Sequence, residues 1–285
     1  MIQTAVCLIN YNAYQDTLAC VESLRKGACH IVVVDNGSTN DSVEQMRQAW
    51  GDDVSVWNTA DEHTFHAVSL SAHGRVHLLL SQRNGGFAYG NNLLLRFVRS
   101  HLSTPFVLWL NNDTEVPEQF VETLERTALQ HGKTSVAIAA EERNFYTGER
   151  RHAGFHYLNL PTGLAFSRPL WPSHRYICGA CLFTSVEAPE WDESYFLYYE
   201  DADYAFRLRQ AGFRLVSTAE TYYLHKQGVS TGQHRETVLK SMWHFYRLHY
   251  PHLRGWVRIV RAIQYRLCGN KTALSALNKS YESAR

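Results

Sequence analysis

The chain contains 285 residues, of which 45% are hydrophobic and 19% are charged. This composition is typical of a folded globular protein and excludes a disordered, collagen-like or coiled-coil chain. The 28 Lys and Arg nearly balance the 27 Asp and Glu, so the formal net charge is +1 and no overall basic surface favours nucleic acid as a partner.

Short apolar runs alternate with amphipathic stretches over residues 1–140. The apolar runs are typical of strands buried on both faces; they cover residues 4–9, 30–34, 76–80, 106–110 and 136–140. The stretches with apolar residues at helical spacing cover residues 16–26, 42–49, 88–99 and 118–130. This alternation predicts a mainly parallel, doubly wound sheet with helices on both faces.

The second half of the chain is less regular. Pro and Gly residues between positions 141 and 176 indicate loops. Strand character returns at 177–183, a helix is expected at 200–211, a strand-like run covers 221–224, and the chain is mostly helical after about residue 235. Residues 58–75 are polar, rich in His and without clear periodicity, so they form an insertion that could shape the acceptor side of a site.

The six cysteines are expected to be reduced thiols of a cytoplasmic protein. Cys178 and Cys181 form the one close pair, which by itself is compatible with a redox or zinc half-site, but a tetrahedral zinc site needs a second pair. The N-terminal residues lack the charged leader of a signal peptide, and no run of 18 apolar residues occurs.

Polar clusters follow four of the predicted strands. In chain order they are Asn10-Tyr11-Asn12, Asp35-Asn36-Gly37-Ser38, the segment from Arg83 to Asn92, and Asn111-Asn112-Asp113. Ligands of open α/β sheets bind at the carboxyl ends of the strands, where all four clusters would meet. A single cluster of this kind is an ordinary turn, whereas four at one edge indicate a binding site.

The absence of two known phosphate-binding motifs limits the classes of nucleotide site that this edge can form. The chain has no G-x-x-x-x-G-K-[ST] segment, and its first strand–helix turn has no G-x-G-x-x-G. These absences disfavour a P-loop NTPase and a dinucleotide-binding dehydrogenase. A nucleotide site without a glycine cradle remains, in which a divalent metal can neutralise a diphosphate. Asp113 is a candidate ligand for that metal, although taken alone it is better explained as a turn residue or as the N-cap of the following helix.

Three further carboxylates open the predicted helix at 200–211. Glu200, Asp201 and Asp203 follow an aromatic run at 195–199, as in a wall that binds a sugar. Acidic residues in a first helical turn are stabilised by the helix dipole, which is the ordinary explanation for them. A carboxylate in this position can also act as a general base toward a hydroxyl. His225 follows the strand-like run and can ligate a metal.

Taken together, these stretches resemble the inverting family-2 glycosyltransferases with a GT-A fold, in particular the rhamnosyltransferase-like branch of bacterial surface-polysaccharide enzymes. The resemblance covers roughly residues 3–232. It rests on the four polar clusters, on Cys178-Gly179-Ala180, on the segment from Asp192 to Asp203, and on His225. It implies a catalytic domain at 1–232, with a nucleotide-binding half at about 1–115 and an acceptor half at about 116–232, and a helical extension at 233–285.

The resemblance also assigns roles to individual residues. Those expected to contact the nucleotide and donor sugar are Asn10, Asn12, Asp35, Arg83, Asn84, Gly85, Gly86, Ala88, Asn91, Asn111, Asn112 and Asp113. Among them, Asp35 would contact the nucleobase. Asp113 and His225 would bind Mg²⁺ or Mn²⁺, with Asn111 replacing the first acid of the family's D-x-D motif. Asp201 would be the general base, flanked by Glu200 and Asp203, and residues 178–180 would line the acceptor side.

The implied reaction moves a sugar from a nucleotide-diphospho-sugar to a hydroxyl of a glycan or lipid-linked glycan, as in O-antigen synthesis. Branch resemblance favours dTDP-rhamnose, and a UDP-hexose, UDP-N-acetylhexosamine or galactofuranose donor stays open. Nucleotidyltransferases need a basic loop after the first strand, and residues 10–15 contain no Lys or Arg. A non-catalytic sugar-nucleotide-binding or scaffold protein of the same fold is the alternative.

Residues 254–271 form a basic amphipathic helix in which arginines alternate with large apolar residues. Such a helix can lie on the anionic inner face of the cytoplasmic membrane. It can also pack its apolar face on the domain with its arginines in solvent, or form a homodimer.

Overall fold

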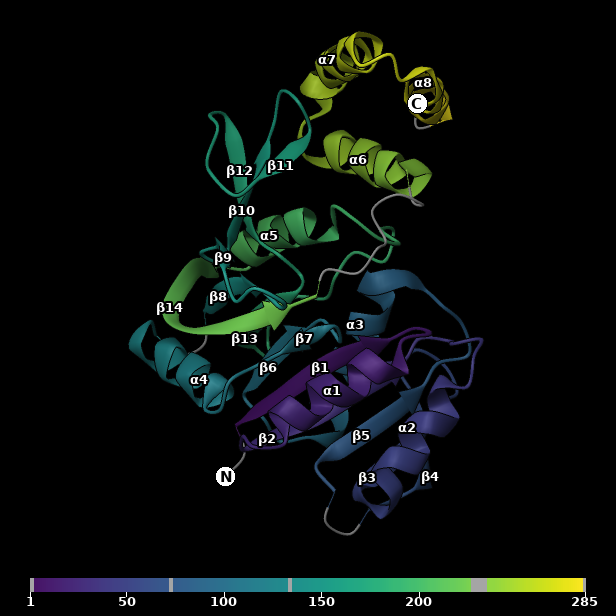
Figure 1. Cartoon of the computed structure of the whole chain (residues 1–285), viewed down its shortest axis with the longest axis vertical. Helices are drawn as coiled ribbons and strands as arrows, with labels where there is room; N and C mark the ends of the chain where they lie inside the picture. The colour runs from purple at the N-terminus through teal and green to yellow at the C-terminus, as the bar shows by residue number, and fades with distance from the viewer. Residues whose placement is uncertain (1–2, 72–73, 133–134, 227–234, 284–285) are drawn as a thin grey trace.

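The computed structural model describes residues 3–71, 74–132, 135–226 and 235–283. Its centre is an eleven-stranded mixed sheet in the order β4-β3-β5-β2-β1-β6-β13-β8-β14-β7, with β9 paired to β8 (Figure 1). The strands are β1 (Thr4–Asn10), β2 (Cys29–Asp35), β3 (Val54–Thr59), β4 (Phe65–Ser69), β5 (Val76–Leu80), β6 (Phe106–Leu110), β7 (Thr114–Glu115), β8 (Val136–Asn144), β9 (Arg150–His152), β13 (Cys181–Ser185) and β14 (Arg214–His225).

Helices cover both faces of this sheet. They are α1 (Tyr14–Leu24), α2 (Ser42–Trp50), α3 (Gly86–His101), α4 (Phe120–Gln130), α5 (Glu200–Gln210), α6 (Arg235–His249), α7 (Arg254–Leu267) and α8 (Lys271–Ser283). Successive strand residues belong to opposite cores: Ala5 and Cys7 of β1 pack with α3, α5 and α6, whereas Val6 and Leu8 pack with α1, α2 and α4. The doubly buried strands explain the continuous apolar runs of the sequence.

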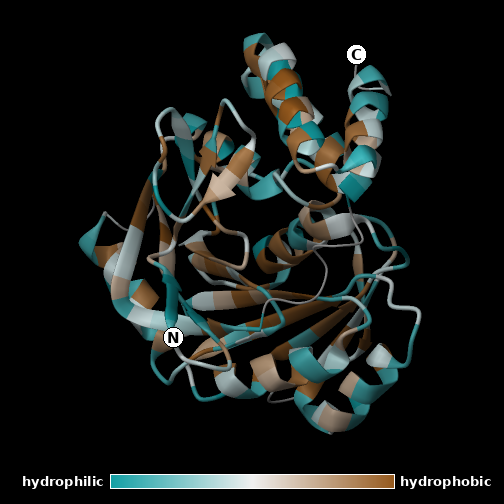
Figure 2. Cartoon of the chain, turned by 45° about the horizontal axis from the view of Figure 1, so that its top comes forward, coloured by the Kyte–Doolittle hydropathy of each residue, from teal (hydrophilic) through white to brown (hydrophobic). Residues whose placement is uncertain are grey.

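A second, three-stranded sheet extends from the large sheet toward the C-terminal helices. It consists of β10 (Phe155–Asn159), β11 (Leu164–Phe166) and β12 (Ser173–Ile177) in the order β11-β10-β12, all antiparallel. Figure 1 shows this sheet beside α7 at the end of the molecule opposite the β3–β4 hairpin. Brown, hydrophobic residues concentrate on the strands of the large sheet and recur along α7 (Figure 2).

The predicted α/β class with a mainly parallel sheet is confirmed, but several details differ. The single strand expected at 177–183 is wrong, because β12 ends at Ile177 and β13 begins at Cys181 after a tight turn. β13 then runs antiparallel between β6 and β8, which interrupts the parallel order. β14 is longer than the run expected at 221–224, since an irregularity between Ser217 and Tyr222 hides its pattern. All six cysteines are free thiols.

Part of the 58–75 insertion belongs to an antiparallel hairpin at the edge of the large sheet. β3 pairs with β4 there, and the turn between them places Glu62 near α3. This edge adjoins β5, with which β3 pairs in parallel. The described part of the insertion therefore packs beside β5 and α3, residues 72–73 lie outside the described part, and a contribution to an acceptor site stays a prediction.

One aromatic stack joins β6 to the loop that precedes α5. Trp109 is fully buried and meets Trp191 and Tyr204 edge-on, at 5.5 and 5.6 Å between ring centroids. We expect Trp109→Ala to lower the free energy of unfolding by about 3–5 kcal/mol, measured by urea denaturation, because it leaves a large cavity. Trp171→Ala is the matched control, since Trp171 is 93% exposed. Equal unfolding midpoints for the two variants would contradict this packing.

Candidate functional site

A cavity of about 480 Å³ lies at the carboxyl ends of β1, β2 and β6, next to the start of α3. Its lining is mostly amide and aromatic: Ile9, Tyr11, Asn36, Asn84, Gly86, Phe87, Asn91, Leu110, Asn111, Asn112, Gly179, Phe196 and Leu197. Five residues expected from sequence to bind the nucleotide and donor sugar thus line one cavity; they are Asn84, Gly86, Asn91, Asn111 and Asn112. The four polar clusters do meet at this edge.

Two amides of the cavity have unused hydrogen-bonding capacity. Asn36 donates from Nδ2 to Asn84 Oδ1 and to the Gly86 carbonyl, both at 3.1 Å. Its Oδ1 atom and Nδ2 of Asn91 are buried and find no hydrogen-bond partner within the described residues. Buried polar atoms are almost always paired, so orphaned ones in a cavity indicate where a bound molecule makes its contacts.

Gly86 sits where the glycine-bearing segment touches the loop at 190–199. Its φ of +88° is unfavourable for other residues, and a Cβ atom there would lie 2.3 Å from the Phe196 carbonyl oxygen. Phe87 donates its backbone N–H to the same oxygen at 2.8 Å. The close approach of these two segments encloses one side of the cavity.

Other predicted donor residues hold the rim together and do not line the cavity. Asn10 donates from Nδ2 to Asp35 Oδ2 at 2.7 Å, and Ser38 N–H donates to Asp35 Oδ1 at 2.9 Å. Asn12 is exposed and accepts from the Thr39 N–H at 2.8 Å. Gly85 precedes α3, and Ala88 is a buried residue of its first turn. Their direct contact with a nucleotide stays a prediction.

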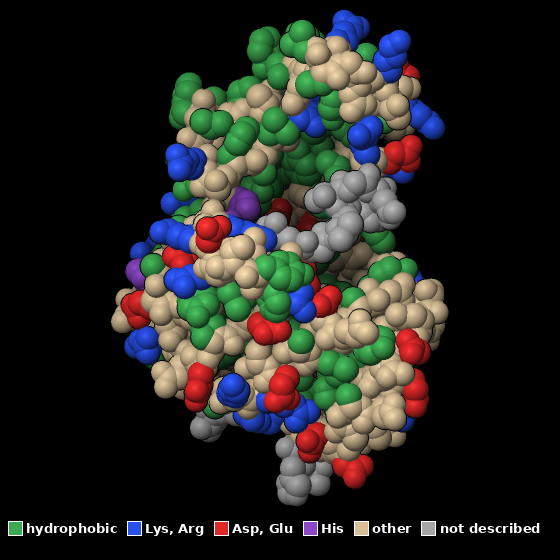
Figure 3. Space-filling model, in the orientation of Figure 1, with side chains coloured by type: hydrophobic (Ala, Val, Ile, Leu, Met, Phe, Trp, Pro, Cys, Tyr) green, Lys and Arg blue, Asp and Glu red, His purple; other side chains and the backbone are tan. Residues whose placement is uncertain are grey.

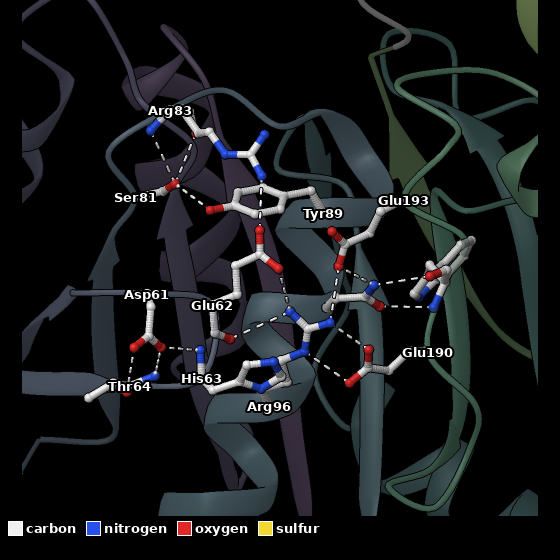
Figure 4. Close-up of polar contacts among 12 residues, drawn as sticks. Asp61, Glu62, His63, Thr64, Ser81, Arg83, Tyr89, Arg96, Glu190 and Glu193 are labelled. Carbon is white, nitrogen blue, oxygen red and sulfur yellow. Dashed lines mark hydrogen bonds and ion pairs between the residues drawn. The ribbon is translucent and has the colours of Figure 1, made fainter.

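Arg83 does not line the cavity either, and Figure 4 shows its side chain between Tyr89 and Glu62. Its guanidinium lies over the Tyr89 ring at 4.3 Å and pairs with Glu62 at 2.9 Å. Glu62 in turn pairs with Arg96 of α3, whose guanidinium binds Glu190 at 2.6 Å and Glu193 at 3.1 Å. This ion-pair network ties the β3–β4 turn, the glycine-bearing segment and the 190–199 loop together.

Asp113 and His225 lie side by side, as the sequence prediction requires. β14 pairs with β7 so that His225 is opposite Thr114, which brings His225 Nε2 to 3.2 Å from Asp113 Oδ1. His225 Nδ1 is 3.2 Å from Glu142 Oε1. Burial alone would lower the pKa of His225, but the hydrogen bonds and charges of the two carboxylates raise it to about 9. One imidazole between two carboxylates is a set of groups that suits a divalent cation.

Glu142 of β8 is an unpredicted part of this cluster. It is buried and accepts hydrogen bonds at Oε2 from His152 (2.8 Å) and from the Tyr223 hydroxyl (2.9 Å). Burial raises the pKa of Glu142, but His152 and His225 outweigh that effect and hold it well below its usual range. Gly154 N–H donates to His152 Nδ1 at 3.1 Å, so the proton of a neutral His152 is on Nε2. His152 therefore donates from Nε2 to Glu142. Because this nitrogen carries the proton, it has no free lone pair for a metal shared with Glu142 and His156.

Glu200 and Asp201 open α5 directly after Tyr198 and Tyr199, whose φ values are +70° and +67°. Both acids line a second cavity of about 290 Å³, which also contains Tyr176, Tyr199 and Arg261. Asp201 Oδ1 accepts from the Ala202 N–H at 2.8 Å, and its Oδ2 faces the Gly179 N–H at 3.5 Å. Because Gly179 lines the first cavity, Asp201 stands between the two cavities.

The two acids differ in protonation. Burial raises the pKa of Asp201 to about 6, and it raises the pKa of Glu200 well above the usual range with help from the Asp201 charge. At neutral pH Asp201 is the ionised partner. Asp203 belongs to neither cavity; its carboxylate is bound by Arg207 Nε and His249 Nε2, each at 2.7 Å. The sequence motif alone gave no reason to separate Asp203, which is held in ion pairs, from Asp201, which lines the second cavity.

Sequence comparison places the chain among sugar-transferring proteins. The sequence model described as "Glycosyl transferase family 2" matches residues 5–188. A curated relative, the low-salt glycan biosynthesis hexosyltransferase Agl10 of Haloferax volcanii, is 23% identical over 240 residues, which are 79% of this chain and 67% of that protein.

Similar solved structures have the same fold. One is GalNAc-T7 with UDP, GalNAc and Mn²⁺, with a TM-score of 0.66 and 13% identity; the match covers all of this chain, which spans about half (54%) of that one. Another is S. aureus TarS 1–349 in complex with UDP-GlcNAc, with a TM-score of 0.54 and 10% identity over the whole chain and 93% of TarS 1–349. The large mixed sheet flanked by helices is therefore a GT-A-like fold.

Proposed function

Because the chain belongs to glycosyl transferase family 2, we propose that it moves a sugar from a nucleotide-diphospho-sugar to a hydroxyl of a glycan or lipid-linked glycan, with inversion at the anomeric carbon. The observation that carries this proposal is the position of Asp201. Its carboxylate faces Gly179 at the boundary between the amide-lined cavity and the second cavity. A donor sugar in the first cavity and an acceptor in the second would meet at this carboxylate.

The amide-lined cavity is the proposed donor site. Asn36 and Asn91 would supply the unused polar atoms, and Phe87 and Phe196 would exclude water. UDP and UDP-GlcNAc are bound in the solved structures of similar fold, and a relative acts in glycan biosynthesis. We propose UDP-sugars and dTDP-rhamnose as the donors to test, and surface-polysaccharide synthesis as the setting. Residues 1–232 would form the catalytic unit and 233–285 an extension.

Asp113 and His225 would hold Mn²⁺ or Mg²⁺. When bound there, such a cation supplies positive charge next to the leaving diphosphate. Asp201 would accept the proton of the acceptor hydroxyl as its oxygen bonds to the anomeric carbon and the bond from that carbon to the diphosphate breaks. One displacement needs no enzyme nucleophile, and the protonated Glu200 beside Asp201 keeps a second charge out of the cavity.

The test is transfer itself. UDP-sugars and dTDP-rhamnose are offered with Mn²⁺ and a lipid-linked glycan extract, and the product is analysed by mass spectrometry and by NMR of the anomeric proton. We expect a product of inverted configuration from one donor. A product of retained configuration would overturn the single displacement. Donor binding without any transfer would instead favour the scaffold alternative.

Glu142 provides a separate test of the metal site. We expect Glu142→Gln to weaken Mn²⁺ binding by about 10–100-fold, because the carboxylate that lies 3.2 Å from His225 Nδ1 and would orient this histidine ligand loses its charge. Glu141→Gln is the matched control, since Glu141 pairs with Arg143 and Arg150 instead. Binding is measured by electron paramagnetic resonance of Mn²⁺. Equal affinities of both variants would show that Glu142 does not orient His225.

A further inference from the structure

Helix α7 turns a stripe of large apolar side chains outward. Trp256, Ile259, Ile263 and Leu267 are 55%, 54%, 50% and 83% exposed, and Val257 is the one buried residue of the helix. Their spacing of three to four residues places them along one side of the helix. The sequence alternative in which this apolar face packs on the domain is therefore wrong.

Arg254, Arg258 and Arg261 lie on the half-buried side of α7, whereas Arg266 is exposed. Arg258 donates to Asn278 Oδ1 at 3.2 Å and lies over the Tyr281 ring at 4.7 Å. Arg261 donates to the Tyr265 hydroxyl at 2.6 Å and also lines the second cavity. The helix thus has its basic side toward α8 and the cavity and its apolar side toward solvent, the reverse of an ordinary surface helix.

The loop between β11 and β12 extends this exposed apolar surface. Leu170 and Trp171 are 48% and 93% exposed. The β11 strand and α7 flank the second cavity together, because Leu164, Ala165 and Arg261 all line it. Figure 3 shows green side chains over the small sheet and α7 at the top of the molecule, with blue ones among them, and a hollow beneath. Trp256, Ile259, Ile263, Leu267, Leu170 and Trp171 are called the apolar cap below.

The end of the molecule that carries the apolar cap has more basic than acidic residues. The small sheet and the helices α7 and α8, residues 155–177 and 254–283, contain eight of the chain's 28 Lys and Arg and one of its 27 Asp and Glu, Glu282. Arg168, Arg266 and Lys271 are exposed next to the apolar cap. An otherwise balanced chain therefore presents exposed apolar groups and positive charge together.

We propose that the apolar cap docks on the surface of an anionic lipid bilayer. Exposed Trp and aliphatic side chains beside Lys and Arg are the combination by which a helix lies in a membrane interface. No described helix is long and apolar enough to cross a membrane. A face-to-face dimer is disfavoured, because it would bring two surfaces of the same charge together.

Docking in this way places the second cavity next to the lipid surface. The cavity is bounded by β11 and α7, and it contains Asp201. An acceptor glycan anchored in the bilayer by its lipid would then reach Asp201 without leaving the membrane. This consequence for the acceptor rests on the proposed function, whereas docking of the apolar cap does not.

The experiment is flotation of the full chain with vesicles of phosphatidylcholine, with and without phosphatidylglycerol. We expect binding to the anionic vesicles, a decrease in 0.5 M salt, and on the order of tenfold weaker binding for the double variant Trp256→Ser and Ile263→Ser. Leu129→Ser on α4 is the matched control, because Leu129 is 53% exposed far from the apolar cap. It is expected to bind like the unmodified chain.

Three outcomes would overturn the proposal. The first is that the chain does not float with anionic vesicles, and the second is that the double variant floats as well as the unmodified chain. The third is that the unmodified chain is a dimer, the double variant is a monomer, and neither binds vesicles. Nucleotide binding, measured by thermal shift for the unmodified chain and for the double variant, tests the proposed function separately from the docking. Vesicle binding without nucleotide binding would leave the docking intact and refute the enzyme assignment.

Discussion

Asp201→Asn is expected to lower the transfer rate by about 10²–10⁴-fold while leaving nucleotide binding unchanged. The amide has nearly the shape of the carboxylate and can still lie next to Gly179, but it cannot take a proton from the acceptor. The donor cavity does not include Asp201, so its affinity should stay the same. The measurement is release of nucleoside diphosphate in the presence of acceptor, with nucleotide affinity measured in parallel.

Asp203→Asn is the matched control, two residues along the same helix. Its carboxylate is bound by Arg207 and His249, so its loss should lower the free energy of unfolding by about 1–3 kcal/mol and leave the rate per folded molecule nearly unchanged. If Asp203→Asn instead removed activity and Asp201→Asn did not, the assignment of the base would be wrong.

The pH dependence of the rate follows from the same carboxylate. Burial raises the pKa of Asp201 to about 6, so below pH 6 most molecules carry a proton on the group that must accept one. The rate should therefore rise from pH 5 to pH 7 and then level off, with a midpoint near 6. A rate that stays constant between pH 5 and pH 7 would contradict a base role for Asp201.

The second large effect is expected for Asp113→Asn. Asp113 is the one charged residue of the Asn111-Asn112-Asp113 turn, and it is half-buried beside His225. Replacing its carboxylate with an amide removes the negative charge that a divalent cation needs at this position. We expect Mn²⁺ binding to be lost and the transfer rate to fall by about 10²–10³-fold.

Calorimetric titration with Mn²⁺ in the presence of UDP measures the first of these effects. Asp16→Asn is the control, because Asp16 also carries a carboxylate near these loops but pairs with Lys226 at 2.7 Å. Unchanged Mn²⁺ affinity in Asp113→Asn would place the cation elsewhere or show that the protein does not use one.

The sequence was sufficient for the mainly parallel sheet and for the grouping of its polar clusters at one edge. Apolar runs that end in polar clusters identify parallel strands, and topology alone then brings Asn84, Asn91 and Asn112 to one edge. The contacts of Glu142 were not predictable in this way. Its partners come from two other strands, His152 from β9 and Tyr223 and His225 from β14, and their meeting depends on the register of β8, β9 and β14.

The direction in which individual side chains point could not be predicted from the sequence patterns either. Arg83 belongs to the predicted glycine-bearing segment but turns to Glu62, a residue of an insertion without periodicity. The amphipathic pattern of α7 identified a helix, yet it did not indicate that Ile259 and Ile263 face solvent. Both outcomes depend on which groups pack against the element, and these groups are distant in sequence.

The most direct test of a nucleotide-sugar site beside Asp113 is a thermal-shift panel of UDP, dTDP, GDP and CDP, each with and without Mn²⁺. A nucleotide at 100 times its dissociation constant stabilises a protein by ~2.7 kcal/mol, which raises the melting temperature by a few degrees. We predict a shift with UDP or dTDP that is larger with Mn²⁺. No shift with any of the four nucleotides, with or without Mn²⁺, would contradict the donor site.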